Sequence, residues 1–292
     1  MRSPAPILCI TNDFGPRAGG IETFIHGLVE RMPHGHVIVY TSGQGDTALY
    51  DQQWRDDYGV EVIRDRATIL LPTFRVARSV RAIVREREIK QVFFGAAAPL
   101  GLLSQGLRKV GVERIIALTH GHEVWWAKIW PFSWAIRRIG NGVDHLTYLG
   151  EFTRSAIGRA LSQQAREAMV RIAPGIDTQH FRPADDAQVL KDELELSNKQ
   201  VIVSVGRLVH RKGQDTLVEA MAEILHEFPQ AHLLFVGVGP HLEYIHKRAV
   251  ELKVLDHISF VGRVQYSELP RFISVGDIFA MPSRSRLAGL EV

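Results

Sequence analysis

The chain has 292 residues, 46% of them hydrophobic and 23% charged, with a formal net charge of +3. This composition is typical of globular proteins and excludes disorder, collagen-like repeats and coiled coils. The length exceeds what one hydrophobic core usually sustains, so we expect two domains. The single cysteine, Cys9, lies in an apolar run, which favours a buried side chain over a reactive thiol and fits a reducing compartment.

The sequence contains no stretch of about 18 uncharged apolar residues, the minimum for a membrane-spanning helix. Its N-terminal apolar stretch is too short for a signal peptide. We therefore expect a cytoplasmic protein, and we expect no nucleic-acid partner.

Short apolar strands alternate with amphipathic helices along the first half, which predicts a parallel sheet. The predicted strands are 7–11, 36–40, 59–63, 91–94, 114–118 and 145–149. Helices are predicted from the glycine pair 19–20, over 74–88, over 99–110 and from about 151.

A segment with two prolines and a glycine, 169–183, interrupts this alternation, and a charged stretch follows it. We place the domain boundary there, with domains 1–172 and 173–292. The second domain then repeats the pattern, with strands 201–205, 232–236, 258–261 and 278–281 and helices 215–227, 241–252 and 267–275. Four strands are fewer than the usual five or six, so we expect this domain to be truncated on its C-terminal side.

The motif GRLVHRKG, residues 206–213, lies between a predicted strand and a predicted helix. Ligands bind beyond the carboxyl ends of strands in such sheets, and a helix N-terminus there attracts phosphate. Arg207 and Lys212 would add two cations. The alternative is a solvated basic loop.

The pair Gly19-Gly20 follows the first predicted strand and the triplet Asn12-Asp13-Phe14. Glycines there would let the backbone approach a ligand closely, and we expect Asp13 to contact an acceptor. The alternative is a flexible turn. The dinucleotide-binding pattern G-x-G-x-x-G is absent from this loop.

His120, His122 and Glu123 follow the end of another predicted strand. A metal site would need further ligands at a recognisable spacing, so we expect none. We favour His120 as a hydrogen-bonding partner of a substrate hydroxyl or of developing charge at an interdomain cleft. The alternative is a structural histidine that bonds to backbone.

Two further segments suggest contact with a membrane. The first is a basic amphipathic helix whose arginines fall on one face, Arg75, Arg78, Arg81 and Arg85. The second is a segment with four tryptophans in ten positions, which favours a membrane interface or an acceptor groove, in particular at Trp125 and Trp126. The alternatives are an ordinary solvated helix and a buried aromatic cluster.

Taken together, TNDFGPRAGGIE, THGHE, SVGRLVHRKGQDTLVEAM, FVGVGP, FVGRV and DIFAMPSRSR resemble the retaining glycosyltransferases of family 4. Within that family, the wording is most similar to phosphatidylinositol mannosyltransferases. The resemblance implies a GT-B fold, in which two Rossmann-like doubly wound domains face a cleft. It also implies transfer of mannose from GDP-mannose to a phosphatidylinositol mannoside by a peripheral protein on an anionic membrane, at the inner face of the cell membrane.

For individual residues, the resemblance implies that Arg207 and Lys212 hold the donor diphosphate and that backbone near Val264 meets the base. Gly19 and Gly20 would lie near the reacting centre, and His120 matches the family's active-site histidine. No metal or other cofactor is expected.

One departure concerns a pair of glutamates separated by seven residues, which the family carries just after the segment that ends at Val292. Glu291 cannot replace that pair. Three alternatives therefore stay open: a family 4 enzyme with another sugar nucleotide and a soluble acceptor, a sugar-nucleotide epimerase of the same shape, and a non-catalytic nucleotide- or lipid-binding fragment.

Overall fold

A computed structural model describes residues 6–17 and 19–284, so Glu291 lies outside the described residues. The chain divides into two compact units, Met1–Gly175 and Ile176–Val292, hereafter unit 1 and unit 2. The division falls inside the proline- and glycine-containing segment 169–183.

Unit 1 is built on one parallel sheet with the strand order β3-β2-β1-β4-β5-β6-β7. Cys9 of β1 is in register with Val39 of β2 and Phe93 of β4. The strands are β1 (Ile7–Thr11), β2 (Val37–Thr41), β3 (Glu61–Arg64), β4 (Gln91–Phe94), β5 (Arg114–Ala117), β6 (His145–Tyr148) and β7 (Val170–Arg171).

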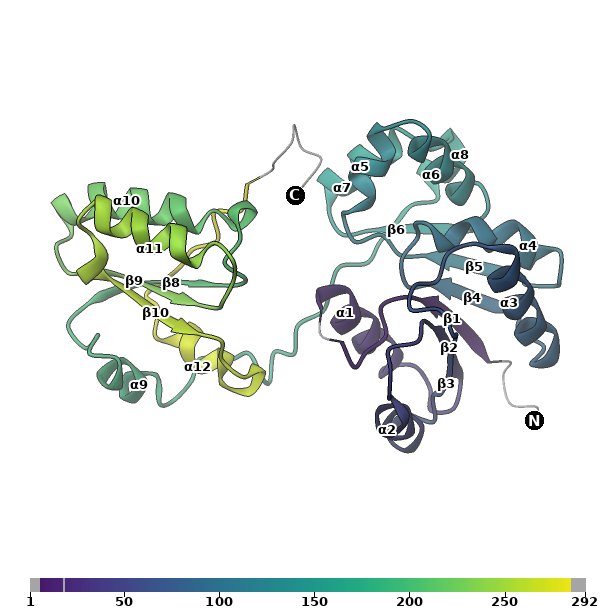
Figure 1. The fold of residues 1–292 in the computed structure, drawn as a ribbon, viewed down its shortest axis with the longest axis horizontal. Helices are drawn as coiled ribbons and strands as arrows, with labels where there is room; N and C mark the ends of the chain where they lie inside the picture. The colour runs from purple at the N-terminus through teal and green to yellow at the C-terminus, as the bar shows by residue number, and fades with distance from the viewer. Residues whose placement is uncertain (1–5, 18, 285–292) are drawn as a thin grey trace. The chain divides into compact units, whose positions relative to one another are not determined.

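Helices cover both faces of this sheet (Figure 1). Because neighbouring residues of a strand point to opposite faces, Cys9 packs into a core with α1 and α2, whereas Leu8 and Ile10 pack into a second core with α3 and α4. The helices are α1 (Gly20–Val29), α2 (Ala48–Tyr58), α3 (Phe74–Glu86), α4 (Ser104–Arg108), α5 (Glu123–Lys128), α6 (Phe132–Gly140), α7 (Glu151–Gly158) and α8 (Gln163–Glu167).

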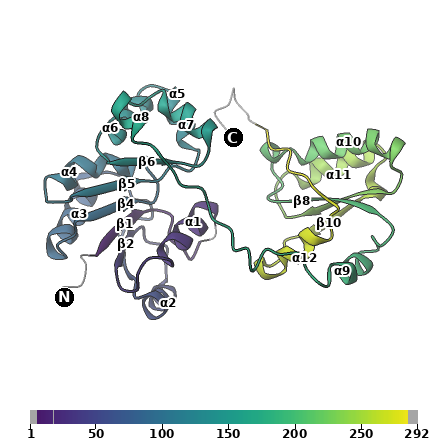
Figure 2. The same ribbon diagram turned by 180° about the vertical axis from the view of Figure 1, so that it is seen from behind.

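Unit 2 repeats this design on a four-stranded parallel sheet with the order β10-β9-β8-β11. Helices α10 and α11 lie on one face of this sheet, and α9 and α12 lie on the other (Figure 2). Phe235 packs with the first pair of helices and Leu234 with the second. The elements are α9 (Ala187–Glu193), β8 (Gln200–Val205), α10 (Gln214–Glu227), β9 (Ala231–Val236), α11 (Leu242–Glu251), β10 (Ile258–Gly262), α12 (Leu269–Ser274) and β11 (Ile278–Phe279).

The predicted α/β class and all ten predicted strands are confirmed, with ends shifted by at most a few residues. The prediction missed β7, α2, α5, α6, α8 and α9. In α2 only Trp54 is buried, and in α9 only Leu190, so neither helix shows a long apolar stripe in its sequence. The helix predicted over 99–110 is a 3₁₀ turn, Leu100–Leu103, followed by the short α4.

Two loops of unit 2 contact each other backbone to backbone. The loop after β8 begins at Gly206, which has φ +147°, and the loop after β9 begins at Gly237, which has φ +145°. A Cβ atom on Gly237 would lie 2.0 Å from the carbonyl oxygen of Gly206, and one on Gly239 would lie 2.1 Å from that of Leu208. Side chains at either position would therefore separate the loops.

This contact can be tested with a matched pair of alanine substitutions. Gly206 has open space around its Cβ position, so Gly206→Ala should add only backbone strain, about 1–3 kcal/mol. Gly237→Ala adds the same kind of strain and also a collision with backbone. Urea unfolding followed by circular dichroism should show a clearly larger loss for Gly237→Ala; equal losses would contradict the close packing.

Candidate functional site

The loops of unit 2 converge where its strand order reverses. β9 lies on one side of β8 and β11 on the other, so the reversal is between β8 and β11, the point where open α/β sheets bind ligands. The backbone nitrogen of Arg284, after β11, donates to the carbonyl oxygen of Arg211, after β8, at 2.9 Å. A Cβ atom on Gly213 would lie 2.1 Å from the carbonyl oxygen of Pro282. The two loops therefore share one edge of the sheet.

Both predicted cations, Arg207 and Lys212, lie in the loop after β8. The side chain of Arg207 is exposed and that of Lys212 is half-buried. Neither makes a hydrogen bond or ion pair with any of the residues that the structure describes. Lys212 precedes Gly213, which adopts a left-handed conformation and caps the N-terminus of α10. Two uncommitted cations beside a helix N-terminus form a suitable environment for a phosphate.

Sequence reasoning missed the group that holds this loop in place. Arg284 donates to Asp215 Oδ2 at 2.6 Å, to His210 Nε2 at 3.0 Å and to Thr216 Oγ1 at 3.2 Å. Burial alone would raise the pKa of Asp215, but the hydrogen bond and charge of Arg284 outweigh it and lower that pKa. The ionised carboxylate therefore stays in the first turn of α10. The contact joins residues 69 positions apart, so no local sequence pattern predicts it.

Val264 lies in the loop after β10, at the same edge of the sheet. Its side chain is half-buried and packs against the core on the α9 and α12 face. Gly262, with φ +84°, turns the chain out of β10 just before it. This packing leaves backbone rather than side chain as the group that residue 264 can offer a ligand.

In unit 1 the strand order reverses between β1 and β4. His120 follows β5, the strand next to β4, and its ring centroid lies 5.5 Å from that of Phe24 on α1, the helix after β1. Its Nε2 is 2.6 Å from the carbonyl oxygen of Gly95, which follows β4. Since a carbonyl only accepts, Nε2 carries the proton and Nδ1 is the acceptor of the neutral ring. Burial lowers the pKa of His120 against the opposing effects of Gly95 and Glu123. The imidazole is thus both bonded to backbone and able to accept a proton at Nδ1.

Acidic side chains surround this histidine. Glu123 is fully buried, accepts from the His120 backbone nitrogen at 3.0 Å, and has its pKa raised by burial. Its Oε1 lies 3.3 Å from His122 Nε2 without hydrogen-bond geometry. Burial, then Glu22, raise the pKa of Asp13. Within residues 6–17 and 19–284, no group of three His, Cys, Asp or Glu is arranged to hold a metal ion.

Gly19 and Gly20 begin α1 beside this cluster. A Cβ atom on Gly19 would lie 2.2 Å from Glu22 Oε2, whereas nothing lies within 4 Å of that position on Gly20. Glu22 is buried and accepts from Arg17 Nε at 3.0 Å. Gly19 therefore makes room for a buried carboxylate, and Gly20 leaves its surface open.

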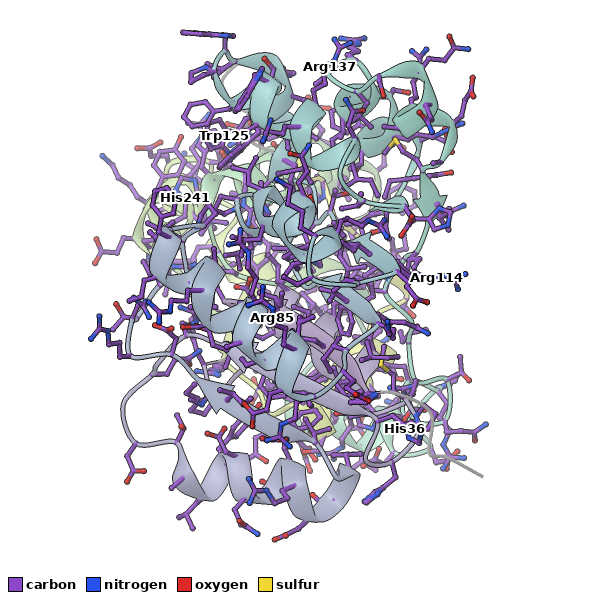
Figure 3. All side chains as sticks on the ribbon, turned by 90° about the vertical axis from the view of Figure 1, so that its right-hand side faces the viewer. His36, Arg85, Arg114, Trp125, Arg137 and His241 are labelled. Carbon is purple, nitrogen blue, oxygen red and sulfur yellow. The ribbon has the colours of Figure 1, made fainter. Side chains whose placement is uncertain are left out.

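The four predicted arginines of α3 have different surroundings. Arg75 donates to both carboxylate oxygens of buried Asp65 at 2.7 Å, and this contact lowers the pKa of Asp65. Arg81 lies against Gly106 of α4. Arg78 and Arg85 are exposed, and Figure 3 shows Arg85 on the outer side of α3.

Exposed apolar side chains precede these arginines. Phe74 is 97% exposed, Ile69 is 63% exposed and Leu71 is also exposed. Their loop is fixed to the end of β1, because Asn12 Oδ1 accepts from the Leu70 nitrogen at 2.6 Å and Asn12 Nδ2 donates to the Leu70 carbonyl at 3.0 Å. We call Ile69 and Leu71 of this loop, together with Phe74 at the start of α3, the apolar loop.

The tryptophans also separate into two groups. Trp125 and Trp126 pack against Phe132 with ring centroids 5.0 Å apart, as half-buried members of an aromatic cluster. Trp130 is 81% exposed, and Trp134 is exposed with the Arg138 guanidinium 5.5 Å from its ring. The rings most available to a partner are therefore not the predicted pair. No helix within the described ranges is long and apolar enough to cross a bilayer.

Comparison with known proteins places the chain among glycosyltransferases. Residues 186–292 match the family model for glycosyl transferases group 1. Over 288 residues the chain is 38% identical to the GDP-mannose-dependent alpha-(1-6)-phosphatidylinositol monomannoside mannosyltransferase of Mycolicibacterium smegmatis, covering 98% of this chain and 75% of that relative. It is 34% identical over 295 residues to the corresponding monoacylated-acceptor mannosyltransferase of Corynebacterium glutamicum, covering 100% and 76%.

Solved structures agree on the fold. The crystal structure of Anabaena HepE in complex with UDP superposes with a TM-score of 0.75 at 17% identity, covering 95% of this chain and 74% of that one. Sucrose-phosphate synthase from Thermosynechococcus elongatus gives 0.69 at 18%, covering 96% and 76%. The predicted GT-B fold with Rossmann-like units is thereby confirmed. The chain is a glycosyltransferase and belongs to the family of the phosphatidylinositol monomannoside mannosyltransferases.

Proposed function

We propose that this glycosyltransferase moves mannose from GDP-mannose to a phosphatidylinositol mannoside at a membrane surface, with retention of configuration. The observation that carries the proposal is the loop between β8 and α10, where Arg207 and Lys212 lie uncommitted beside a helix N-terminus. The identities of the base, the sugar and the acceptor rest on the names of the relatives, which specify GDP-mannose and phosphatidylinositol monomannoside.

Unit 2 would hold the donor through its diphosphate. When the bond between the sugar's anomeric carbon and the β-phosphate oxygen breaks, negative charge grows on that phosphate. Arg207, Lys212 and the N–H groups of α10 would stabilise this charge, as preorganised donors do in other transferases. These fixed positive groups would take the part that a divalent cation plays in metal-dependent transfer, and backbone near Val264 would meet the base.

Unit 1 would orient the acceptor. The Nδ1 atom of neutral His120 can accept a hydrogen bond from a hydroxyl, while its Nε2 stays bonded to Gly95. Asp13, whose pKa is raised by burial, offers a second polar contact near His122, two residues after His120. In retaining transfer the acceptor oxygen bonds to the anomeric carbon, and the departing phosphate takes its proton. His120 then positions the hydroxyl rather than acting as the final base.

The membrane part of the proposal rests on the apolar loop and the exposed arginines that follow it. The apolar face of α3 packs into the core of unit 1, so this helix would offer the membrane only its exposed cations, each contributing about 1 kcal/mol near an anionic surface. Phe74, nearly fully exposed, would enter the interface, while Arg78 and Arg85 face the lipid headgroups. Because Asn12 ties the apolar loop to the end of β1, membrane contact would place the lipid acceptor near His120, at the cytoplasmic face of the cell membrane.

Arg207→Ala and Lys212→Ala should each lower kcat for mannosyl transfer by about 100-fold or more, because each removes a charge that acts as the phosphate departs. The full-length enzyme would be assayed with labelled GDP-mannose and phosphatidylinositol monomannoside. Lys247→Ala, which removes an exposed lysine from α11, is the control and should retain activity. Unchanged turnover in both loop variants would refute the donor assignment.

Phe74→Ser should reduce binding to vesicles containing phosphatidylinositol, because it removes the most exposed apolar ring of the apolar loop. Cosedimentation of the full-length protein with such vesicles measures the bound fraction. Leu49→Ser is the matched control, since Leu49 is 89% exposed on α2 of the same unit. Equal binding by wild type and Phe74→Ser would contradict membrane contact through this loop.

A further inference from the structure

A groove between α1 and α2 in unit 1 shares Arg17, Gly19 and Glu22 with the candidate site and extends beyond it along α2. Its volume is about 350 Å³, within the range of small-molecule pockets. Tyr50, Trp54 and Tyr58 line it from α2 and are called the aromatic wall, Glu22 lines it from α1, and Arg17 lines it from the loop after β1. We propose that this groove binds a sugar ring already present on the acceptor, so that the enzyme selects a glycosylated lipid. This inference rests on the proposed function.

The aromatic wall is held rigidly in place. Tyr50 Oη is 2.9 Å from His26 Nε2, and the Arg64 guanidinium lies 5.9 Å from the Tyr50 ring centroid. Arg64 in turn donates to Asp51 at 2.7 Å and to the Gly15 carbonyl at 2.9 Å. Rings fixed in this way lose little freedom when a ligand stacks on them, which favours binding. The apolar C–H face of a hexose is a suitable partner for such a surface.

A sugar site also needs polar side chains that can form hydrogen bonds with the hydroxyl groups of the sugar. Gln53 and Asp57 line the groove one turn apart on α2, and both are exposed. Neither side chain makes a hydrogen bond or ion pair among residues 6–17 and 19–284. An amide and a carboxylate can together bind neighbouring hydroxyl groups, since the amide donates and accepts and the carboxylate accepts.

The charge of the groove distinguishes a sugar from a phosphate. Three carboxylates line it, Glu22, Glu30 and Asp57, against the single guanidinium of Arg17. Arg17 is already paired with Glu22 at 3.0 Å. This excess of negative charge disfavours the lipid's phosphate and suits a neutral ligand rich in hydroxyl groups.

The position of the groove connects it to the reacting end of unit 1. Glu22, at one end of the groove, contributes to the electrostatic surroundings of both Asp13 and His120. A sugar in the groove would therefore belong to the same acceptor whose hydroxyl His120 positions. The enzyme would read the sugar that is present before it adds the next one.

The test uses two double variants of α2 in the full-length protein. Gln53→Ala with Asp57→Ala removes the polar side of the groove. Gln52→Ala with Asp56→Ala is the matched control. These exposed residues each precede one of the groove residues by one position, lie outside the groove and hydrogen-bond to each other at 2.7 Å. Loss of two hydrogen bonds should raise KM for phosphatidylinositol monomannoside about tenfold. KM for GDP-mannose should stay unchanged, and the control should behave as wild type.

A direct probe is methyl α-mannoside, measured by saturation-transfer NMR with GDP filling the donor site. Wild type and the control should show an NMR saturation-transfer signal on the methyl mannoside, and the groove variant should lose this signal. A saturation-transfer signal retained by the groove variant, together with an unchanged KM for the acceptor, would overturn the groove assignment. Failure of the proposed function would look different, because wild type would then transfer no mannose from GDP-mannose whatever the state of the groove.

Discussion

The parallel pairing of strands is the constraint on which both candidate sites depend. Every strand pair in the described part of the chain is parallel, so within each sheet all carboxyl ends meet at one edge. Chain order then decides where that edge opens, between β1 and β4 in unit 1 and between β8 and β11 in unit 2. His120 follows β5 and its ring bonds to Gly95, just after β4 at the first opening, and Arg207 follows β8 at the second. The topology of each sheet thus determines where its candidate site lies, and the side chains there supply the chemistry.

Long-range contacts turn these openings into sites with fixed geometry. In unit 2, Gly237 permits the loop after β9 to support the loop after β8, and Arg284 holds the first turn of α10 through Asp215. In unit 1, the two hydrogen bonds between Asn12 and Leu70 join the reacting end of β1 to the apolar loop. One polar side chain therefore couples the candidate acceptor site to the surface proposed to meet lipid.

The sequence predicted what local patterns encode and missed what distant contacts decide. Apolar runs and helical periodicity located the strands, and the position of Arg207 and Lys212 between a strand and a helix followed from them. The commitment of Arg75 to Asp65 was not predictable, because the partner lies on another element and the four arginines look alike in sequence. The sequence favoured Trp125 and Trp126 over Trp130 as partner-binding rings for a similar reason. Only packing against Phe132 distinguishes the half-buried rings from the exposed one. The groove escaped notice because α2 has almost no apolar stripe.

We propose that this chain carries out the chemistry of its family, with a guanosine diphosphate sugar as donor and a mannosylated inositol lipid as acceptor. To test this, the full-length enzyme is incubated with vesicles of phosphatidylinositol monomannoside and a panel of labelled sugar nucleotides. The labelled lipid is then identified by mass spectrometry and NMR. We expect one additional mannose, delivered from GDP-mannose alone and joined in the α configuration. Transfer of another sugar, a β linkage, or no labelled lipid with any donor would contradict it.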